Sequence, residues 1–502
     1  MAKKAEKKIE NHERAPIIVV MGHIDHGKTT LLDFIRKAKV AEKETGGITQ
    51  HIGAYEAEHK GKKITFLDTP GHAAFGKMRS RGAKVADIAI LVVSAEEVIK
   101  QQAKEAISII KEAGIPYVVA INKMDRPNAD PNRTKKGLAE NEVLIEEYGG
   151  KVPAVEISAK TGKNVDTLLD TLLVVAELEE LKWDPSRPAS GVVIEAHVEP
   201  RRGKAATLLI RDGILKKGEF LVIQGAVTPI RVLGNFRDEP IDEARAAMPV
   251  VVYNLSEIAP LGAEFRVFEE KSAAEDFASQ TKAKAAARTG PLAGAGRPTL
   301  NIVLKTDVLG SREAIEQLFE KLQFEKVGTR ILKSETGDIN ESDVKLAAGG
   351  KNIIIVGFRV KIPAVFQELA AVHNVPVIIR EIIYELEDEI KKELIKLVPT
   401  EIKRVDTGRA KILALFKKDK GKQIVGGKVT EGVAKRGAKF EIERNKIKIG
   451  DGRIHGLQQQ KKDTDEVKEG LEFGVLAEAT VEIAEGDILR IFEEEEALPS
   501  LS

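Results

Sequence analysis

The stretch Gly22-His-Ile-Asp-His-Gly-Lys-Thr29 decides the fold of the N-terminal part of the chain. It follows an apolar run at 16–21 and opens an amphipathic pattern over residues 28–37, where apolar side chains recur at helical spacing. Glycines let the backbone approach a phosphate closely, and the amides at a helix start carry partial positive charge. The motif G-x-x-x-x-G-K-[ST] between a strand and a helix therefore predicts a phosphate-binding loop, in which Lys28 reaches the phosphates and Thr29 holds Mg²⁺.

Apolar runs and helical patterns continue to alternate after this loop. Four further runs are predicted as buried strands, at 64–67, 88–93, 117–121 and 154–157. Alternation of this kind predicts a doubly wound, mostly parallel sheet. A segment with two prolines at 183–190 closes this domain, which we place at residues 16–187.

Three short motifs lie at the ends of these predicted strands. In Asp68-Thr-Pro-Gly71, the carboxylate can hold Mg²⁺ through water and the glycine amide can reach a γ-phosphate. In Asn122-Lys-Met-Asp125, the final carboxylate suits the N1–H and 2-amino donors of guanine, whereas adenine would leave it unpaired. Ser158-Ala-Lys160, a common tripeptide, can place an amide at guanine O6.

Together the four elements predict a GTP site. Its predicted residues are Gly22, His23, Ile24, Asp25, His26, Gly27, Lys28, Thr29, Thr30, Asp68, Gly71, Asn122, Lys123, Asp125, Ser158, Ala159 and Lys160.

The rest of the chain divides by composition into further segments. Short strands with glycine turns predict β-barrels, and renewed alternation of strands and helices predicts an α/β/α domain. We expect a charged, disordered tail at 1–15, a barrel at 188–270, a helix and linker at 271–298, the α/β/α domain at 299–385, a linker helix at 386–402 and a C-terminal barrel at 403–502.

Two sequence similarities link the barrels. The run 211–218 (RDGILKKG) resembles 430–437 (TEGVAKRG), and 259–267 resembles 483–491 in the same order. These similarities predict two barrels of one type, with chance recurrence of glycine turns as the alternative.

Composition excludes several classes of protein. The 502 residues include no cysteine, which rules out disulfides, thiolate metal sites and cysteine nucleophiles. No apolar stretch approaches a membrane span. The charged N-terminus has no apolar core, so it is not a secretory signal, and Glu6, Glu10 and Glu13 argue against a transit signal. We therefore expect a cytoplasmic chain without a membrane partner. The net charge is only +1, but 402–462 carries +12 and 463–502 carries −11. This contrast predicts either an RNA-binding face or mutual neutralisation within one barrel.

Residues 16–183 resemble the G domain of translational GTPases. The segments GHIDHGKTTLLDFIRKAKVAEKETGGITQHIGAY and DTPGHAAFGKMRSRGAKVADIAILVV look like the bacterial translation initiation factor 2 family. The resemblance continues through LNIVLKTDVLGSREAI and EIKRVDTGRAKILALFK and covers roughly residues 16–492. It implies a compact form that lacks the long N-terminal extension of the family.

The resemblance assigns roles to individual residues of the GTP site. Thr49 matches the threonine that joins Mg²⁺, with Thr29 and with Asp68 through water, and that senses the γ-phosphate. His72 matches the catalytic histidine that positions the attacking water. Ile24 and Ile48 match apolar residues that screen this histidine, although ordinary packing explains them equally well. No arginine is identifiable as a finger in cis, so hydrolysis to GDP should need stimulation by the ribosome.

The resemblance also implies a set of partners. These are formylmethionyl initiator tRNA, both ribosomal subunits and other initiation factors, acting with a monomeric chain. The last barrel should hold the 3′ end of the tRNA. Here the chain departs from the family, because Gly427 and Phe473 replace two cysteines near the pocket for formylmethionine. The glycine would enlarge that pocket and the phenylalanine would fill it, so the changes either compensate or alter formyl recognition. Candidate contacts are Arg409, Gly427, Lys428, Glu472, Phe473 and Gly474.

Two other functions stay open at this point. The chain could be another translational GTPase, for elongation or specialised tRNA delivery, but GGITQHIGAY and the domain at 299–385 argue against that. It could also be a clamp for tRNA or ribosome in which GTP only sets the shape. His72 argues against the clamp.

Overall fold

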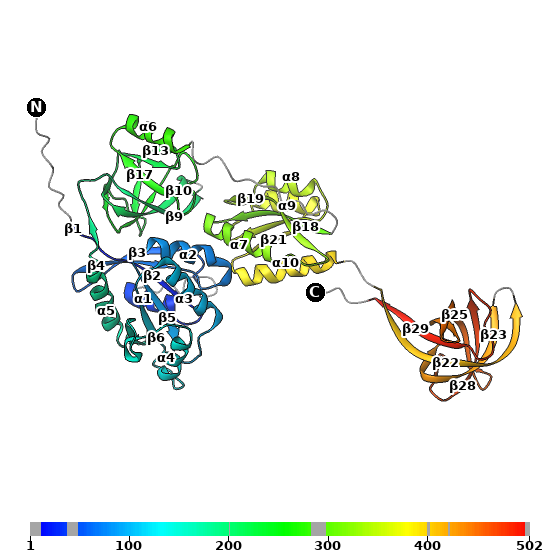
Figure 1. The fold of residues 1–502 in the computed structure, drawn as a ribbon. Coiled ribbons are helices and arrows are strands. Elements are labelled where there is room, and N and C mark those ends of the chain that lie inside the picture. The colour runs from blue at the N-terminus through cyan, green and yellow to red at the C-terminus, as the bar shows by residue number, and fades with distance from the viewer. Residues whose placement is uncertain are drawn as a thin grey trace, which may run out of the picture. The chain divides into compact units, whose positions relative to one another are not determined.

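The computed structural model describes residues 12–37, 49–199, 201–282, 298–398, 402–419 and 422–496 (Figure 1). Ile48 of the expected apolar screen lies outside these residues. The chain divides into two compact units, Met1–Leu394 and Ile395–Ser502. Among the described residues, no helix combines the length and the apolar character needed to cross a membrane.

The first unit begins with the predicted doubly wound sheet, which the structure confirms. Every neighbouring pair of strands is parallel except β3 with β4. Only the antiparallel edge strand β3 was not expected from the sequence. The order across the sheet is β3 (Gly53–His59), β4 (Lys62–Asp68), β2 (Ile17–Gly22), β5 (Ile88–Ser94), β6 (Tyr117–Asn122) and β7 (Ala154–Glu156).

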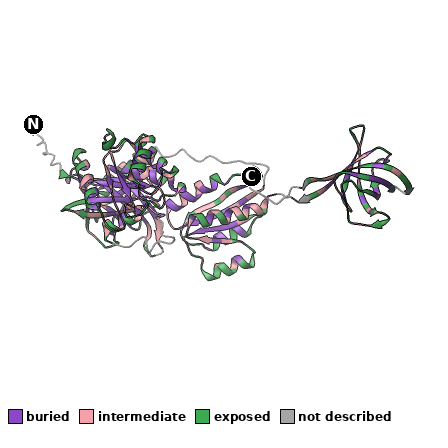
Figure 2. Ribbon diagram, turned by 90° about the horizontal axis from the view of Figure 1, so that it is seen from below, coloured by how far each residue is buried: buried purple, intermediate pink, exposed green. Residues whose placement is uncertain are grey.

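Helices cover both faces of this sheet. On one face α1 (Lys28–Arg36) and α5 (Val165–Leu178) share a core with Ile18 and Val20 of β2. α2 (Gly76–Val85) packs on the opposite face, where Gly82 meets Val19, and α3 (Gln101–Ala113) packs against α2. α4 (Pro131–Glu140) begins at Asp130, whose carboxylate accepts a hydrogen bond from the Arg133 amide. The buried strands are the purple layer of Figure 2.

The expectation of a disordered tail over 1–15 is wrong for residues 12–15, because these residues belong to the predicted GTP-binding domain. β1 (His12–Glu13) pairs with β8 (Lys182–Trp183). The Arg14 guanidinium is buried and lies 2.6 Å from the Asp87 carboxylate. In sequence, Arg14 looks like one more charge of a solvated segment, because its partner is far along the chain.

A β-barrel follows the first domain. Its main sheet has the order β13 (Ala226–Pro229), β12 (Phe220–Ile223), β17 (Glu264–Phe268), β9 (Ser190–Glu199), β10 (Gly203–Asp212), β16 (Pro249–Val252) and β14 (Leu233–Asn235). A separate pair consists of β11 (Ile214–Lys216) and β15 (Glu243–Arg245). α6 (Lys271–Lys282) packs on β12 with Ala274 and Ala278.

The next domain is the predicted α/β/α sandwich. Four parallel strands lie in the order β19 (Gly328–Thr336), β18 (Thr299–Thr306), β20 (Ile353–Phe358) and β21 (Val377–Arg380). α8 (Glu341–Ala348) and α9 (Ala364–Val372) share a core with β18 and β20, and α7 (Leu309–Lys321) packs against β18 and β19. α10 (Ile383–Leu397) starts three residues before the expected linker helix and ends before residue 402.

The second unit is a closed barrel. Its strands run in the order β22 (Ile402–Asp419), β29 (Ile488–Glu496), β24 (Lys439–Arg444), β25 (Ile447–Gln459), β28 (Glu472–Ala479), β23 (Lys422–Lys435) and β27 (Glu466–Lys468), and β22 also pairs with β23. The short β26 (Lys462–Asp463) pairs with β25.

The two barrels repeat the same turns. The first glycine of each similar run has a positive φ, 78° at Gly213 and 70° at Gly432, and so does the last, 96° at Gly218 and 87° at Gly437. Each run then pairs with a short strand, β11 with β15 and the end of β23 with β27. The runs 211–218 and 430–437 therefore form the same turn with the same kind of strand pairing, as their sequence similarity predicts.

Ion pairs cross between the basic and acidic halves of the C-terminal barrel. They join Lys435 to Glu493, Lys439 to Glu494 and Arg444 to Asp487, at 2.7, 2.6 and 2.8 Å. Part of the charge contrast is therefore neutralised within the barrel.

Candidate nucleotide site

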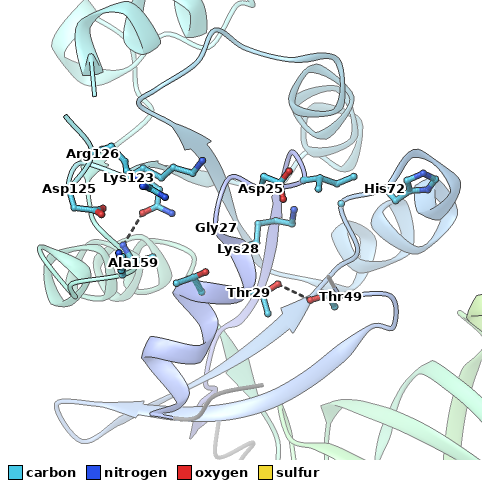
Figure 3. A pocket seen from close by; sticks show the side chains of 15 residues that line it. Asp25, Gly27, Lys28, Thr29, Thr49, His72, Lys123, Asp125, Arg126 and Ala159 are labelled. Carbon is cyan, nitrogen blue, oxygen red and sulfur yellow. Dashed lines mark hydrogen bonds between the residues drawn. The ribbon is translucent and has the colours of Figure 1, made fainter. Parts of the chain in front are cut away.

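A cavity of about 410 Å³ opens where the strands β2, β4 and β6 end (Figure 3). All four predicted sequence elements contribute to its wall. Its lining residues are Ile24, Asp25, Gly27, Lys28, Thr29, Thr30, Thr49, Gly71, His72, Asn122, Lys123, Asp125, Arg126, Ala159 and Lys160.

Two glycines shape the phosphate end of the cavity. Gly27 has a φ of 87°, and a Cβ atom there would lie 2.4 Å from Asn122 Nδ2. A Cβ atom at Gly71 would lie 2.6 Å from Lys28 Nζ and 3.1 Å from Ile24 Cγ1. The backbone therefore passes close to the Asn122 amide at Gly27 and close to the Lys28 ammonium at Gly71, without a side chain in the way.

Lys28 is held by its own loop. Its Nζ donates hydrogen bonds to the carbonyl oxygens of Gly22 and His23, at 3.0 and 2.8 Å. Burial lowers the pKa of Lys28 from 10.5 to about 8, against the opposing effect of Asp68. The two carbonyl oxygens are neutral acceptors, so a phosphate anion would bind the Lys28 ammonium more strongly than they do.

Three oxygen-bearing side chains converge beside the lysine. Thr29 Oγ1 lies 2.9 Å from Thr49 Oγ1, which donates a hydrogen bond to Asp68 Oδ2 at 3.1 Å. Two hydroxyl groups and a carboxylate are the kind of ligands that Mg²⁺ takes, so the residues fit this ion.

The base end of the cavity is joined to the phosphate loop by Asn122. Its Nδ2 donates to the His26 carbonyl oxygen and its Oδ1 accepts from the Ala159 amide, both at 2.8 Å. Asp125 Oδ1 accepts a hydrogen bond from Ser158 Oγ at 2.7 Å, and this bond lowers the pKa of the carboxyl. The carboxylate is therefore ionised and oriented, as recognition of guanine N1–H and the 2-amino group requires.

His72 lies at the phosphate end, on the segment after Gly71. Its Nδ1 accepts a hydrogen bond from the Ala74 amide at 3.1 Å. Burial lowers the pKa of the imidazole to about 4, so it is neutral near pH 7. Its ring points away from Lys28 (Figure 3).

Five predicted residues lie behind the wall rather than on it: Gly22, His23, His26, Asp68 and Ser158. Asp68 and Ser158 act through Thr49 and Asp125, and His26 is buried with Nδ1 3.3 Å from the Val92 carbonyl oxygen. Sequence analysis missed Arg126, which lines the cavity and directly follows the motif ending at Asp125. It also missed buried Arg79, whose guanidinium donates to the carbonyl oxygens of Pro70 and His72.

The candidate tRNA contacts gather in the C-terminal barrel. On the paired strands β23 and β28, Gly427 faces Phe473, Lys428 faces Glu472 and Gly426 faces Gly474. Arg409 lies on β22, opposite Glu431 of β23.

The fold and this site define a translational GTPase. Residues 13–177 match the elongation factor Tu GTP binding domain, 188–268 match elongation factor G domain 2, and 274–391 match translation-initiation factor 2. The chain belongs to the translation initiation factor IF-2 family, whose members are GTP-binding GTPases of protein biosynthesis.

Relatives with that name are similar over most of this chain. The factor from Rubrobacter xylanophilus is 40% identical over 96% of this chain and 71% of its own length. The factor from Roseiflexus castenholzii is 41% identical over 96% of this chain and 67% of its own length. Among solved structures, GDP-bound aIF5B from Aeropyrum pernix matches with 28% identity over 96% of this chain and 92% of that chain, at a TM-score of 0.48. A bacterial selenocysteine-specific elongation factor, EF-Sec, matches with 23% identity over 50% of this chain and 45% of its own, at a TM-score of 0.42.

Proposed function

We propose that this chain is a ribosome-activated initiation GTPase. It binds GTP and Mg²⁺, brings formylmethionyl initiator tRNA to the small ribosomal subunit and promotes joining of the large subunit. It acts as a cytoplasmic monomer together with other initiation factors. The observation that carries the GTPase part is the convergence of the phosphate loop, Thr49, Asp68, Gly71 and Asp125 around one cavity.

Hydrolysis follows from the roles of these residues. Water attacks the γ-phosphorus in line, the bond to the β–γ bridging oxygen breaks, and GDP and phosphate leave. Lys28 and the loop amides stabilise the negative charge on the phosphate oxygens, and the Gly71 amide contacts the γ-phosphate. Thr29 and Thr49, with Asp68 through water, would hold Mg²⁺, which would neutralise further phosphate charge.

His72 orients the attacking water in this proposal. Its ring points away from Lys28 (Figure 3), and Ile24 Cγ1 lies 3.1 Å from the place that a Cβ atom at Gly71 would occupy. The ribosome would therefore have to bring the imidazole toward the γ-phosphate. This need explains why turnover by the isolated chain should be slow.

The C-terminal barrel offers a surface suited to methionine. Four apolar side chains of β22 and β23 are exposed to solvent: Leu413, Leu415, Phe416 and Ile424. The Phe416 ring lies over Gly426, because a Cβ atom there would be 2.8 Å from its Cε2. Exposed apolar side chains commonly mark binding sites, and Gly426 directly precedes Gly427, which faces Phe473 on β28.

Turnover with and without ribosomes tests the proposal. We expect ribosomes to raise the rate of GTP hydrolysis by the intact chain. His72→Ala should lower the ribosome-stimulated rate about 100-fold or more, while its GDP affinity stays within about threefold of wild type. His373→Ala, at an exposed histidine after α9, is the matched control and should behave as wild type. Equal rates with and without ribosomes would refute the proposal.

A further inference from the structure

Tyr384, in the first turn of α10, packs against the imidazole of His72. The ring centroids are 4.3 Å apart and the ring planes meet at 89°, an edge-to-face contact. Tyr384 is 39% exposed, so its ring covers the histidine from the solvent side rather than filling a core.

Other contacts fix the remaining sides of His72. The Ala74 amide donates to Nδ1, the Phe75 ring lies edge-on at 6.0 Å, and the Arg79 guanidinium donates to the histidine carbonyl oxygen. These three contacts come from the histidine's own segment and from α2. Among the ring contacts described for His72, that of Tyr384 comes from a different domain, and the charges of Glu387 in α10 and Lys321 in α7 also act on the pKa of the imidazole.

The first turn of α10 is also bound to the segment that carries Thr49. Gln50 is 1% exposed, and its Nε2 donates to the Glu381 carbonyl oxygen at 2.9 Å. Its Oε1 accepts a hydrogen bond from the Ile383 amide at 3.3 Å. The residue after Thr49 therefore holds both ends of the short turn that precedes Tyr384.

We propose that Tyr384 is a positioning residue that keeps the His72 ring turned away from the γ-phosphate until the first turn of α10 moves. The inference rests on the catalytic role proposed for His72. An edge-to-face pair is a weak restraint, so the contact slows hydrolysis without blocking it. Removing the aromatic ring should leave His72 freer to reach the attacking water.

Turnover without ribosomes measures this restraint. We expect Tyr384→Ala to raise the rate of GTP hydrolysis without ribosomes about three- to tenfold. This range corresponds to the free energy of one aromatic pair. Tyr384→Leu, which keeps apolar volume but no ring, should act in the same direction, and Tyr384→Phe should stay within about twofold of wild type. Tyr148→Ala, at an exposed tyrosine after α4, is the matched control. Unchanged GDP affinity shows that each variant is folded.

Histidine-selective NMR titration gives a readout that does not depend on activity. Burial is the main cause of the low pKa of His72. Loss of the covering ring in Tyr384→Ala should therefore raise this pKa toward 6.5, and Tyr384→Phe should not. Spectra of His72→Ala identify the signal among the nine histidines.

The outcomes separate the two proposals. In a His72→Ala background, Tyr384→Ala should no longer change the rate. If His72→Ala loses ribosome stimulation but Tyr384→Ala keeps the wild-type rate and His72 pKa, the positioning role alone is overturned. If His72→Ala keeps full stimulation, the catalytic role of His72 fails and the positioning role fails with it.

Discussion

The Cζ atom of Phe473 lies 2.8 Å from the place that a Cβ atom at Gly427 would occupy. The two residues face each other on β23 and β28, and Phe473 is 5% exposed. The ring therefore uses the space that the glycine leaves. This geometry favours compensation between the two departures from the family over a simple enlargement of the pocket.

A methyl group at position 427 should disturb the barrel. Besides the Phe473 ring, it would meet the Lys411 carbonyl oxygen at 2.6 Å. We expect Gly427→Ala to destabilise β23 by about 1–3 kcal/mol, the usual cost of overpacking, measured by hydrogen exchange of its amides. In a Phe473→Ala background the cost should be smaller, because only the clash with the Lys411 carbonyl remains.

Gly474→Ala is the control for this prediction, since nothing lies within 4 Å of its added Cβ. Its effect should stay within about 0.5 kcal/mol of zero. If Gly427→Ala destabilised the wild-type chain and the Phe473→Ala variant by the same free energy, the Phe473 ring would not occupy this space.

Nucleotide selectivity should depend on Asp125. An asparagine there offers one donor and one acceptor, which no longer match the two donors of guanine but match N1–H and the C2 carbonyl of xanthine. We expect Asp125→Asn to weaken GDP binding roughly 10²- to 10⁴-fold and to bind xanthosine diphosphate instead, as measured by competition titration. Asp166→Asn, at an exposed carboxylate of α5, should bind GDP as wild type does. Retained preference for GDP in Asp125→Asn would remove Asp125 from the base site.

Nucleotide binding should be linked to a proton on Lys28. Burial lowers the pKa of its ammonium group to about 8 in the chain without nucleotide, and phosphate anions would raise it. Above pH 8 most Lys28 side chains of the nucleotide-free chain have lost their proton. GDP binding must then be accompanied by uptake of a proton, so the affinity for GDP must fall as the pH rises. We expect uptake of about half a proton or more near pH 8.5 and almost none near pH 7, from calorimetry in buffers of different ionisation enthalpy. Absence of uptake at both pH values would contradict this linkage.

The nucleotide site is the part of the molecule that the sequence predicts best. Its motifs follow buried strands directly, and parallel strands bring their ends to one edge, so local spacing suffices to gather Lys28, Asp68 and Asp125. Sequence spacing does not reveal the contacts of Gln50 with the turn before α10, or of Tyr384 with His72. Those partners belong to a different domain, and no local pattern marks them.

Two misses in the fold have a similar cause. Strand β3 reads GAYEAEH, in which only Tyr55 and Ala57 pack on the core, alternating with Glu56 and Glu58, so its apolar signal is short and weak. It forms because β4 offers an unpaired edge. The sequence predicts Arg14 in a solvated tail, because its buried partner, Asp87, lies far along the chain, after α2.

The most direct test of the proposed initiation role is protection of the aminoacyl ester of initiator tRNA by the intact chain. Formylated and unformylated methionyl-tRNA are compared, with hydrolysis of the ester as the readout. If Gly427 and Phe473 together rebuild a formyl-reading pocket, the formylated ester is protected selectively and Phe473→Ala loses this selectivity. Equal protection of both esters, or protection of neither, would contradict the account of the C-terminal barrel as the reader of formylated initiator tRNA.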